Sequence, residues 1–504
     1  MKKLIAFIII VGLMIFINCE INQPDAPVLN ISRNTLAISK IIALGASYTS
    51  GFQSGGLVES FQKKSYPYLI MQQMGRQSEF EMPWIDSPGI SSVSGQGPLK
   101  WVNGQIVPGD PYTDPLALLK NALLARPYDN LGVPGAKIGD VLSTVSSQTN
   151  PFYGIVLRNP NFANTSETDQ GIMLQSALVL LLLPGGNDYL GAATSGTAIV
   201  EPGAGFTITS PQNHLSRLTQ VIERIQSSTR ATIIMSNLPY PNLLPYVNLL
   251  DPLVYVDVPV PGIGTVKLPV VFDAQFQPVN FSPDPNNPLY LPLVTEEGIV
   301  GGQASPIKHI LLPFLSQYQA TGLGVPDSTI IANTLIGLGF DQVTAAALAQ
   351  QAVQGLIAAG LTPSGVPIPG TLTLTEAEEQ IVNDAVDDYN ANILSVAQSK
   401  GVPVVDLITP INQIIQSPGS FGVTALFVFF DPNTTMFSLD GVHPNDAGQA
   451  LIANEFVKKI NSTFGLQIPN INPGNYTGQY SSSRITRIAP GAIEQAVKVF
   501  STQN

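Results

Sequence analysis

A carboxylate and an imidazole stand three residues apart in the segment DGVHP, which covers residues 440–444. A histidine works as a general base when a partner fixes its tautomer and stabilises its protonated form, and a carboxylate one turn away can do both. Among the three histidines of the chain, only His443 has such a partner, Asp440, with a predicted helix start just after it. We therefore expect a chemical role for His443 and structural roles for His214 and His309.

A serine follows a short apolar run in the segment IIALGASYTSG, which covers residues 41–51. A serine in a glycine-flanked turn directly after a buried strand is in a suitable position for a nucleophile, so Ser47 is the candidate. The neighbouring hydroxyls of Thr49 and Ser50 are the fallback nucleophiles. Capping of the following helix is the ordinary structural role for a serine at this place.

Two further turns offer hydrogen-bond donors for a substrate oxygen. The segment NLGVPGA at 130–136 is rich in glycine, and such a turn can expose a backbone N–H. The segment PGGND at 184–188 follows the most apolar run of the chain, and there Asn187 can donate a side-chain N–H to an oxyanion. A tight turn and a helix cap, the latter at Asp188, are the structural alternatives.

Together the four segments, in this order over residues 41–448, resemble the conserved blocks of the SGNH (GDSL-type) hydrolase family. The resemblance implies that Ser47 is the nucleophile, His443 the general base and Asp440 the group that orients it. One position departs from the family pattern, because Ala46 stands where the family usually has Asp or Asn. That side chain is not a catalytic group, so the implied mechanism does not depend on it.

The resemblance also implies an oxyanion hole and a reaction class. The donors would be the backbone N–H groups of Ser47 and Gly135 and the side chain of Asn187. The implied reaction is ester hydrolysis by acyl transfer, with His443 moving the proton. No metal and no organic cofactor is expected.

The apolar runs of the chain alternate with helical patterns, which predicts an α/β fold. Strand, helix, strand and helix in this order imply a mostly parallel sheet with helices on both faces. With the resemblance, the predicted fold is a three-layer α/β/α sandwich of the SGNH/flavodoxin-like type, with a large mixed α+β insertion near the active site. Strands are predicted at 41–44, 176–183, 231–235, 402–407 and 425–430, and helices at 116–126, 137–147, 212–226, from 375 onward and at 444–460.

Residues 240–372 interrupt this alternation and are predicted to be an insertion. They include a predicted hairpin at 254–272 and a helical stretch at 328–360 in which Asp341 is the only charged residue. A weakly charged apolar segment beside a site can form a lid or an acyl pocket, and a core-packed helix pair is the alternative. The predicted parts of the chain are a signal peptide (1–18), a tether (19–38), a hydrolase domain (39–239 and 373–465), the insertion (240–372) and a C-terminal extension (466–504) without a predicted role.

The N-terminus predicts export and a lipid anchor. Lys2 and Lys3 precede an apolar run at 4–17, a pattern typical of a signal peptide. Cys19 is the only cysteine, so the chain has no internal disulfide, and its place just after the apolar run resembles the lipidated cysteine of bacterial lipoproteins, although residues 16–18 depart from the usual small-residue motif. We expect a lipoprotein at the bacterial outer membrane, on the periplasmic or the cell-surface face.

The composition excludes several other classes of protein. Charged residues make up 12% of the chain, and 23 Lys and Arg against 35 Asp and Glu give a net charge of −12. This balance argues against nucleic acid as a partner, and the 44% hydrophobic content argues against disorder. The expected partners are a small-molecule or lipid ester and a membrane surface.

The substrate class is left between two kinds of ester. The apolar insertion, together with Phe429, Phe430 and Phe437, favours an apolar acyl chain, as in a lipase or carboxylesterase. Trp84 and Trp101 favour an O-acetylated carbohydrate, since sugar sites use stacking aromatic rings. A lipoprotein that keeps the fold only for binding is the non-enzymatic alternative.

Overall fold

The computed structural model describes residues 38–250, 293–296, 307–428, 431–480 and 487–498, except 338 and 359, and the backbone of short strands between 255 and 290. All of the described residues belong to one compact unit. The predicted signal peptide and Cys19 lie outside the described residues. Within the described residues, no helix combines the length and apolarity needed to cross a bilayer.

A four-stranded parallel sheet forms the centre of the fold, in the order β1 (Ile41–Leu44), β6 (Leu178–Leu181), β7 (Thr232–Ser236) and β15 (Val404–Val405). A backbone segment that starts at Asp129 runs parallel along the other side of β1. There, the N–H of Ala43 donates to the carbonyl of Asp129 at 2.8 Å, and Leu131 donates to that of Ala43 at 2.9 Å. The chain thus adds to one side of β1 before it crosses to the other, which is the doubly wound pattern. The predicted parallel α/β architecture is confirmed.

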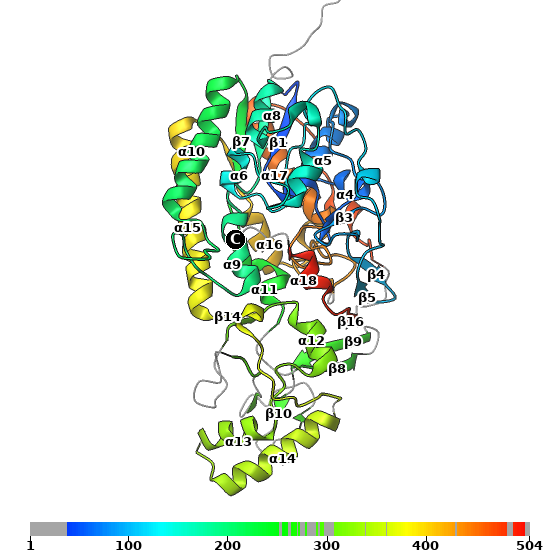
Figure 1. The fold of residues 1–504 in the computed structure, drawn as a ribbon, viewed down its shortest axis with the longest axis vertical. Coiled ribbons are helices and arrows are strands. Elements are labelled where there is room, and N and C mark those ends of the chain that lie inside the picture. Colours follow the sequence, from blue (N-terminus) through cyan, green and yellow to red (C-terminus); the bar gives the residue numbers. More distant parts are fainter. Residues whose placement is uncertain are drawn as a thin grey trace, which may run out of the picture. The chain divides into compact units, whose positions relative to one another are not determined.

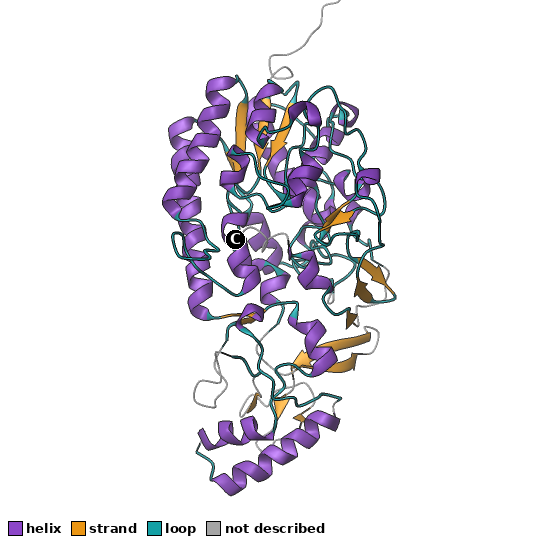
Figure 2. Ribbon diagram, viewed as in Figure 1, coloured by secondary structure: helices purple, strands orange, loops and turns teal. Residues whose placement is uncertain are grey.

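Helices cover both faces of this sheet, because alternate strand residues point to opposite sides. On one face, Val179 and Ile233 join the core cluster that includes α10 (Pro211–Ser228) and α15 (Glu376–Lys400). On the other, Leu180 and Ile234 join the cluster that includes α5 (Tyr66–Gln73) and α17 (Asp446–Phe464). Figure 2 shows the strands between these helices, and Figure 1 labels them.

The two long helices α10 and α15 follow their sequence patterns with small corrections. α15 begins with a capping box, since Thr375 and Glu378 exchange hydrogen bonds. Two apolar residues of these helices lie outside the buried stripes: Ile381 is 37% exposed and Leu215 is 36% exposed. In α15 the buried stripe runs through Val382, which is one turn before both Ala385 and Val386, whereas Ile381 is one turn before Ala385 alone.

The prediction of a helix at 116–126 is wrong. Only one turn of 3-10 helix forms, at Leu116–Leu118. The backbone that follows pairs with a neighbouring segment instead: Leu119 bridges Ile85, and the N–H of Lys120 donates to the carbonyl of Trp84 at 3.0 Å. Asn121 then adopts a left-handed φ of 43°, which ends any helix.

Three other predicted elements differ in length or type. The helix predicted at 137–147 is reduced to α6 (Ile138–Leu142), and the strand at 402–407 to two residues. Residues 425–428 form no strand, and 429–430 lie outside the described residues. The remaining elements are α3 (Ser47–Ser50), β2 (Gly56–Leu57), α4 (Glu59–Gln62), β3 (Ile90–Ser91), β4 (Lys100–Val102), β5 (Gln105–Val107), α7 (Pro151–Val156), α8 (Glu167–Met173), α9 (Asn187–Ser195), α16 (Ile408–Gln416), β16 (Arg487–Ile488) and α18 (Ala492–Ala496).

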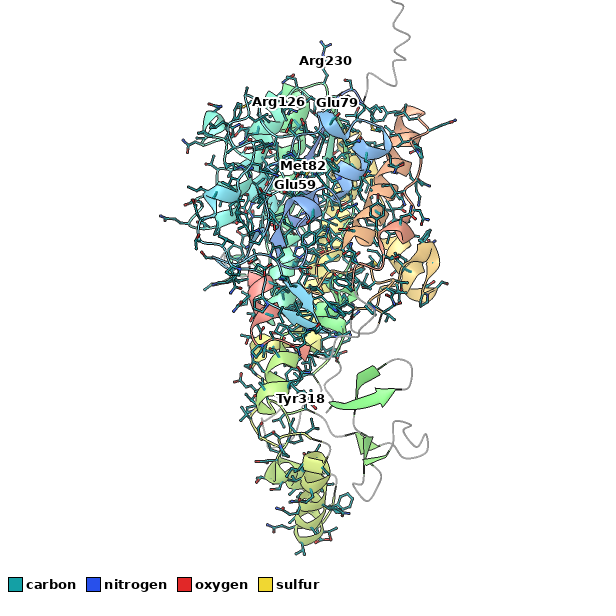
Figure 3. The ribbon with its side chains drawn as sticks, turned by 90° about the vertical axis from the view of Figure 1, so that its right-hand side faces the viewer. Glu59, Glu79, Met82, Arg126, Arg230 and Tyr318 are labelled. Carbon is teal, nitrogen blue, oxygen red and sulfur yellow. The ribbon has the colours of Figure 1, made fainter. Side chains whose placement is uncertain are left out.

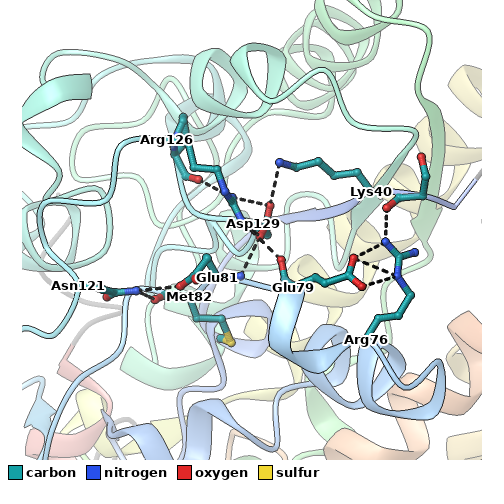
Figure 4. A network of polar contacts seen from close by, with 10 residues as sticks. Lys40, Arg76, Glu79, Glu81, Met82, Asn121, Arg126 and Asp129 are labelled. Atoms are coloured by element: carbon teal, nitrogen blue, oxygen red, sulfur yellow. Dashed lines mark hydrogen bonds and ion pairs between the residues drawn. The ribbon is translucent and has the colours of Figure 1, made fainter.

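An ionic network holds the segment beside β1 in place (Figure 4). The buried carboxylate of Asp129 accepts hydrogen bonds from Arg126 at 2.7 and 2.9 Å and from the backbone N–H of Glu81 at 2.8 Å. Lys40 adds an ion pair at 3.6 Å. Figure 3 shows Arg126 near Glu79, well away from Tyr318 in the insertion.

Residues 240–372, the predicted insertion, contain both predicted parts. Strands β8 (Tyr255–Val260) and β9 (Gly264–Pro269) form the predicted antiparallel hairpin, and α13 (Ser328–Gly337) and α14 (Gln342–Ala358) form the helical stretch. The carboxylate of Glu379 in α15 forms an ion pair with Lys308 Nζ at 2.5 Å, and His309 Nε2 lies 3.3 Å from its other oxygen. The other elements of the insertion and its junction are α11 (Pro245–Asn248), β10 (Val271–Phe272), β11 (Pro278–Val279), β12 (Leu289–Tyr290), β13 (His309–Ile310), α12 (Phe314–Thr321) and β14 (Thr373–Leu374).

Candidate active site

Ser47 is the first residue of α3, directly after β1, which is the place predicted for it. The turn before it needs glycine, because a Cβ on Gly45, whose φ is +135°, would lie 2.8 Å from Thr49 Oγ1. Ser47 lines a pocket that Thr49 and Ser50 do not line. Ser50 Oγ donates to the carbonyl of Ser47 at 2.8 Å, and Thr49 Oγ1 donates to that of Leu44 at 3.4 Å. The two fallback hydroxyls therefore point into the protein.

Asp440 and His443 form a fully buried pair, with 2.8 Å between Oδ2 and Nδ1. Burial alone would raise the pKa of Asp440, but the charge of His443 and the hydrogen bonds from that residue lower the pKa below its usual value. Oδ1 accepts from the N–H groups of Val442 at 3.0 Å and His443 at 2.9 Å and from Ser438 Oγ at 3.0 Å. Nδ1 of the ring is therefore held by the carboxylate, which leaves Nε2 as the ring nitrogen that can act as a base.

His443 packs against the residues that follow Ser47. Its ring centroid lies 4.7 Å from that of Phe52 and 5.5 Å from that of Tyr48. The hydroxyl of Tyr48 donates to the carbonyl of Val442 at 2.6 Å. The structure thus brings the Asp440–His443 pair together with the turn of Ser47, although they come from opposite ends of the chain.

Asn187 lines the same pocket as Ser47. It is the first residue of α9, after β6, and its side-chain Nδ2 donates to the carbonyl of Ala136 at 2.9 Å. Ser47 and Asn187 therefore follow two neighbouring strands, β1 and β6. The strand order reverses between these two strands, and open α/β sheets bind their ligands at the carboxyl ends of such a pair.

Gly135 lies between two anchored residues but is not among those that line this pocket. Before it, the N–H of Val133 donates to the carbonyl of Gly45 at 3.1 Å, and after it, Ala136 accepts from Asn187. Gly135 has a φ of +82°, which glycine adopts without strain. Gly135 is thus next in the chain to Ala136, whose carbonyl holds Asn187, and it lies in the turn expected from the sequence.

A buried network that the sequence did not reveal supports the segment of Asn187. His214 Nε2 lies 3.0 Å from the carbonyl oxygen of Pro184, and its ring stacks on Tyr389 with centroids 4.0 Å apart. Burial lowers the pKa of His214 to about 4, so the ring is neutral and Nε2–H donates. Asp188, expected as a cap, instead accepts from the N–H of Ile138 at 2.7 Å and from a threonine hydroxyl. No sequence signal linked these residues, because they lie on separate helices.

Another buried carboxyl lies behind the turn of Ser47. Glu167 Oε2 accepts from the N–H of Gly45 at 3.1 Å, and burial raises the pKa of Glu167 well above its usual value. The residue opens α8 and is fully buried. Glu167 thus fixes the backbone two residues before Ser47, a role that sequence reasoning missed because glutamate at a helix start is common.

The pocket of Ser47 continues into a second, strongly apolar pocket, and we call the two together the apolar groove. The far part is lined by Ile411 and Ile414 of α16 and by Phe437, as predicted for that phenylalanine. Phe429 and Phe430 lie outside the described residues. Both parts share Tyr48, Leu183, Pro239, Tyr240 and Leu244.

Among the described residues of 240–372, only the first ones line the groove. Tyr240 and Leu244 line both parts, and Leu243 lines the far part. The described residues of α13 and α14 line neither part, and the two helices bury residues such as Leu335 and Leu356. The helix pair therefore fits the core-packed alternative better than an acyl pocket.

The two tryptophans do not form a sugar platform at this site. Trp84 packs edge-on against Tyr68, with centroids 5.6 Å apart, and Trp101 stacks on Tyr480 at 5.1 Å. They belong to different core clusters, and neither lines the groove. In the described part of the chain, no three His, Cys, Asp or Glu side chains are grouped so that they could hold a metal.

Comparison with known proteins bears on the C-terminal part of the chain. The model of the GDSL-like lipase/acylhydrolase family matches residues 340–456, which include α14, α15, β15, α16, Asp440 and His443. The match supports the SGNH/GDSL family. It also supports an α/β hydrolase fold with esterase or acylhydrolase activity. No curated protein and no solved structure matches the chain.

The matched segment and the predicted domain borders do not coincide. The match begins at residue 340, inside the segment predicted as an insertion. It does not include Ser47, Gly135 or Asn187, which all lie N-terminal to it.

Proposed function

We propose that this protein is a serine ester hydrolase that acts by acyl transfer through Ser47, His443 and Asp440. One observation carries the proposal: Asp440 Oδ2 accepts hydrogen bonds from His443 Nδ1 and from the N–H of Gly55, both at 2.8 Å. Gly55 belongs to the loop that follows Ser47, so the buried acid–base pair is attached to the nucleophile's own segment.

In this mechanism, His443 Nε2 takes the proton of Ser47 Oγ as the oxygen attacks the ester carbonyl. The imidazolium that forms is stabilised by the carboxylate of Asp440, whose lowered pKa keeps it ionised. The alcohol leaves with the proton from His443. Water then attacks the acyl-enzyme, with the same histidine as base, and Ser47 is regenerated.

The negative charge of the tetrahedral intermediate needs fixed donors. We assign this role to the N–H groups of Ser47 and Gly135 and to Asn187. The hydrogen bond from Asn187 to Ala136 fixes the amide, and one Nδ2 proton is left for the oxyanion. Because α3 spans only Ser47–Ser50, its dipole contributes little to binding an anion. The side chain of Asn187 is therefore the main donor.

We propose that the preferred esters have an apolar acyl chain, which the apolar groove would bind. Its far part exposes almost only carbon to a ligand, through residues such as Ile414, Phe437 and Leu451. Each methylene moved from water into such a site contributes about 0.8 kcal/mol. An acetylated carbohydrate would leave this part of the groove unused, and the tryptophans that favoured it are engaged elsewhere.

Hydrolysis of p-nitrophenyl esters from acetyl to long acyl chains tests the proposal. Ser47→Ala is expected to lower kcat/KM at least about a thousandfold, because the nucleophile is lost. Ser50→Ala is the matched control on the same turn and should stay within a fewfold of the wild type. Absence of turnover with every ester would favour the binding-only alternative, and a rate that peaks at acetyl would favour the carbohydrate esterase.

We also propose that Cys19 carries the lipid anchor of an exported outer-membrane protein. The support is the sequence pattern alone: two lysines, an apolar run and a single cysteine after it. Metabolic labelling with a radioactive fatty acid should mark the wild type and not Cys19→Ser. Label that persists in Cys19→Ser, or a wild type without label, would contradict the anchor.

A further inference from the structure

Gly55, whose N–H donates to Asp440, lies in a loop that several hydrogen bonds hold in place. Gly55 donates to Asp440 Oδ2, the same oxygen that binds the His443 ring. Next to it, the N–H of Ser54 donates to Ser438 Oγ at 2.9 Å, and Ser54 Oγ accepts from the N–H of Leu439 at 3.3 Å. These bonds fix the loop on the side of the acid–base pair.

On its other side, the loop contacts the C-terminal helix α18. A Cβ on Gly55 would lie 2.5 Å from Ala496 Cβ and 2.7 Å from Ala496 Cα, so the helix touches the bare backbone of the glycine. Gly55 also has a φ of +78°, which disfavours any side chain. Ser92 bridges the two: its N–H donates to the carbonyl of Gly55 at 3.0 Å, and its Oγ donates to that of Ala496 at 3.2 Å.

The segment that contains α18 is itself well anchored (Figure 1). Ile488 in β16 pairs in parallel with Ile106 of β5, and the N–H of Ala489 donates to the carbonyl of Ile106 at 2.8 Å. Ile493 of α18 is fully buried. Glu494 Oε1 accepts from Ser316 Oγ of α12 at 3.3 Å, which links the helix to the insertion as well. These contacts attach residues 487–498 firmly to the rest of the fold.

We infer that residues 487–498 are a positioning element of the active site: the backbone of α18 at Ala496 packs on Gly55 and so holds the N–H that fixes the carboxylate of Asp440. The inference rests on the proposed function, because it needs Asp440 as the partner of the catalytic histidine. Ala496 is the positioning residue, since only a small side chain leaves the loop where it is. The role gives a function to the C-terminal extension, for which the sequence suggested none.

A size series at position 496 tests the inference in the full-length protein: Ala496→Gly, Ala496→Ser, Ala496→Val and Ala496→Leu. A lost hydrogen bond to a charged group corresponds to about a 10- to 100-fold change in rate, so kcat should fall by about this factor from serine to leucine, with KM nearly unchanged. Without the N–H of Gly55, the carboxylate becomes more basic and holds the protonated imidazole. The acid limb of the kcat/KM profile should therefore move to higher pH as the side chain grows.

Two controls separate positioning from general stability. Ala496→Gly weakens the helix but leaves room, so it should keep the wild-type pH profile, and Gln495→Leu changes the same helix without touching Gly55. Where the larger residues prevent folding, Ala496→Ser and Ser92→Ala decide, because they change only one atom or one hydrogen bond.

The outcomes separate this inference from the proposed function. Unchanged pH profiles in every folded variant, Ala496→Ser and Ser92→Ala included, would overturn the positioning role even if the wild type is an active, Ser47-dependent esterase. A wild type without Ser47-dependent turnover would instead overturn the proposed function. A graded shift of the acid limb, absent from Ala496→Gly and Gln495→Leu, is the result we expect.

Discussion

The side-chain amide of Asn187 donates a 2.9 Å hydrogen bond to the carbonyl oxygen of Ala136. This bond joins the turn that follows β6 to the turn that contains Gly135. In the sequence these two turns are separate segments, and no pattern indicates that they are in contact. Because Asn187 and Ser47 line the same pocket, the bond fixes the amide beside Ser47 before any substrate arrives.

Asn187→Ala should therefore lower kcat by about 100- to 1,000-fold while KM changes little, since the lost donor acts mainly in the transition state. Steady-state kinetics on the best p-nitrophenyl ester measures this. Asn161→Ala, at an exposed position, is the control and should behave as the wild type. A rise in KM with unchanged kcat would instead show that Asn187 acts in substrate binding.

The acyl preference should change when the far part of the groove is filled. Ile414→Trp is expected to lower kcat/KM for long-chain esters by about 200-fold, which corresponds to four excluded methylenes, and to leave the acetyl ester unaffected. Ile415→Trp is the matched control, because Ile415 is the next residue of α16 and is 42% exposed. Equal loss on all chain lengths would show that Ile414 supports folding and not acyl binding.

A methyl group on Gly185 should disturb the segment of Asn187. Its Cβ would lie 2.5 Å from His214 Nε2, and its φ is +94°. Gly205 has a similar φ of +67° but open space around it, so Gly205→Ala measures the backbone strain alone, about 1–2 kcal/mol of unfolding free energy. Gly185→Ala should cost more than this and should also reduce kcat. Equal stabilities of the two variants, from denaturant unfolding, would contradict the tight contact with His214.

The stability of the fold should depend on the charge of Asp446. Burial raises the pKa of this carboxyl to about 6, although Gln53 donates to its Oδ1 at 3.0 Å. Because the folded state holds the proton more tightly than the unfolded state, the stability that the neutral acid provides is complete below about pH 4 and is lost between about pH 4 and pH 6.

Asp446→Asn removes this titration. The difference in unfolding free energy between Asp446→Asn and the wild type should grow from near zero at low pH to at most about 3 kcal/mol above pH 6, at about 1.4 kcal/mol per pKa unit. Urea unfolding of both proteins at several pH values gives the difference directly. A difference that does not vary with pH would contradict the raised pKa.

Local patterns were sufficient for some parts of the site. Ser47 follows a strand whose apolar run ends at a glycine, and Asp440 and His443 are one turn apart, so each placement needs only neighbouring residues. The capping box of Thr375 is local in the same way. The pattern failed at 116–126, where the apolar spacing fits a helix but the backbone bonds to Trp84 and Ile85 instead.

Contacts between distant segments were not predictable from one sequence. His214 under Pro184, Glu167 behind Gly45 and Ala496 against Gly55 join residues on separate elements, and none has a sequence signal of its own. The low charge of 328–360 suggested an acyl pocket, but α13 and α14 also need uncharged residues to pack on each other. Composition alone could not separate these two uses.

The most direct test of the central claim is covalent labelling of the nucleophile. A fluorophosphonate ester should modify the wild type at a single site, and mass spectrometry of its peptides should place the adduct on Ser47. His443→Ala should label far more slowly, because Ser47 then lacks its base. An adduct on Thr49 or Ser50, or an active esterase that is labelled elsewhere, would contradict the account.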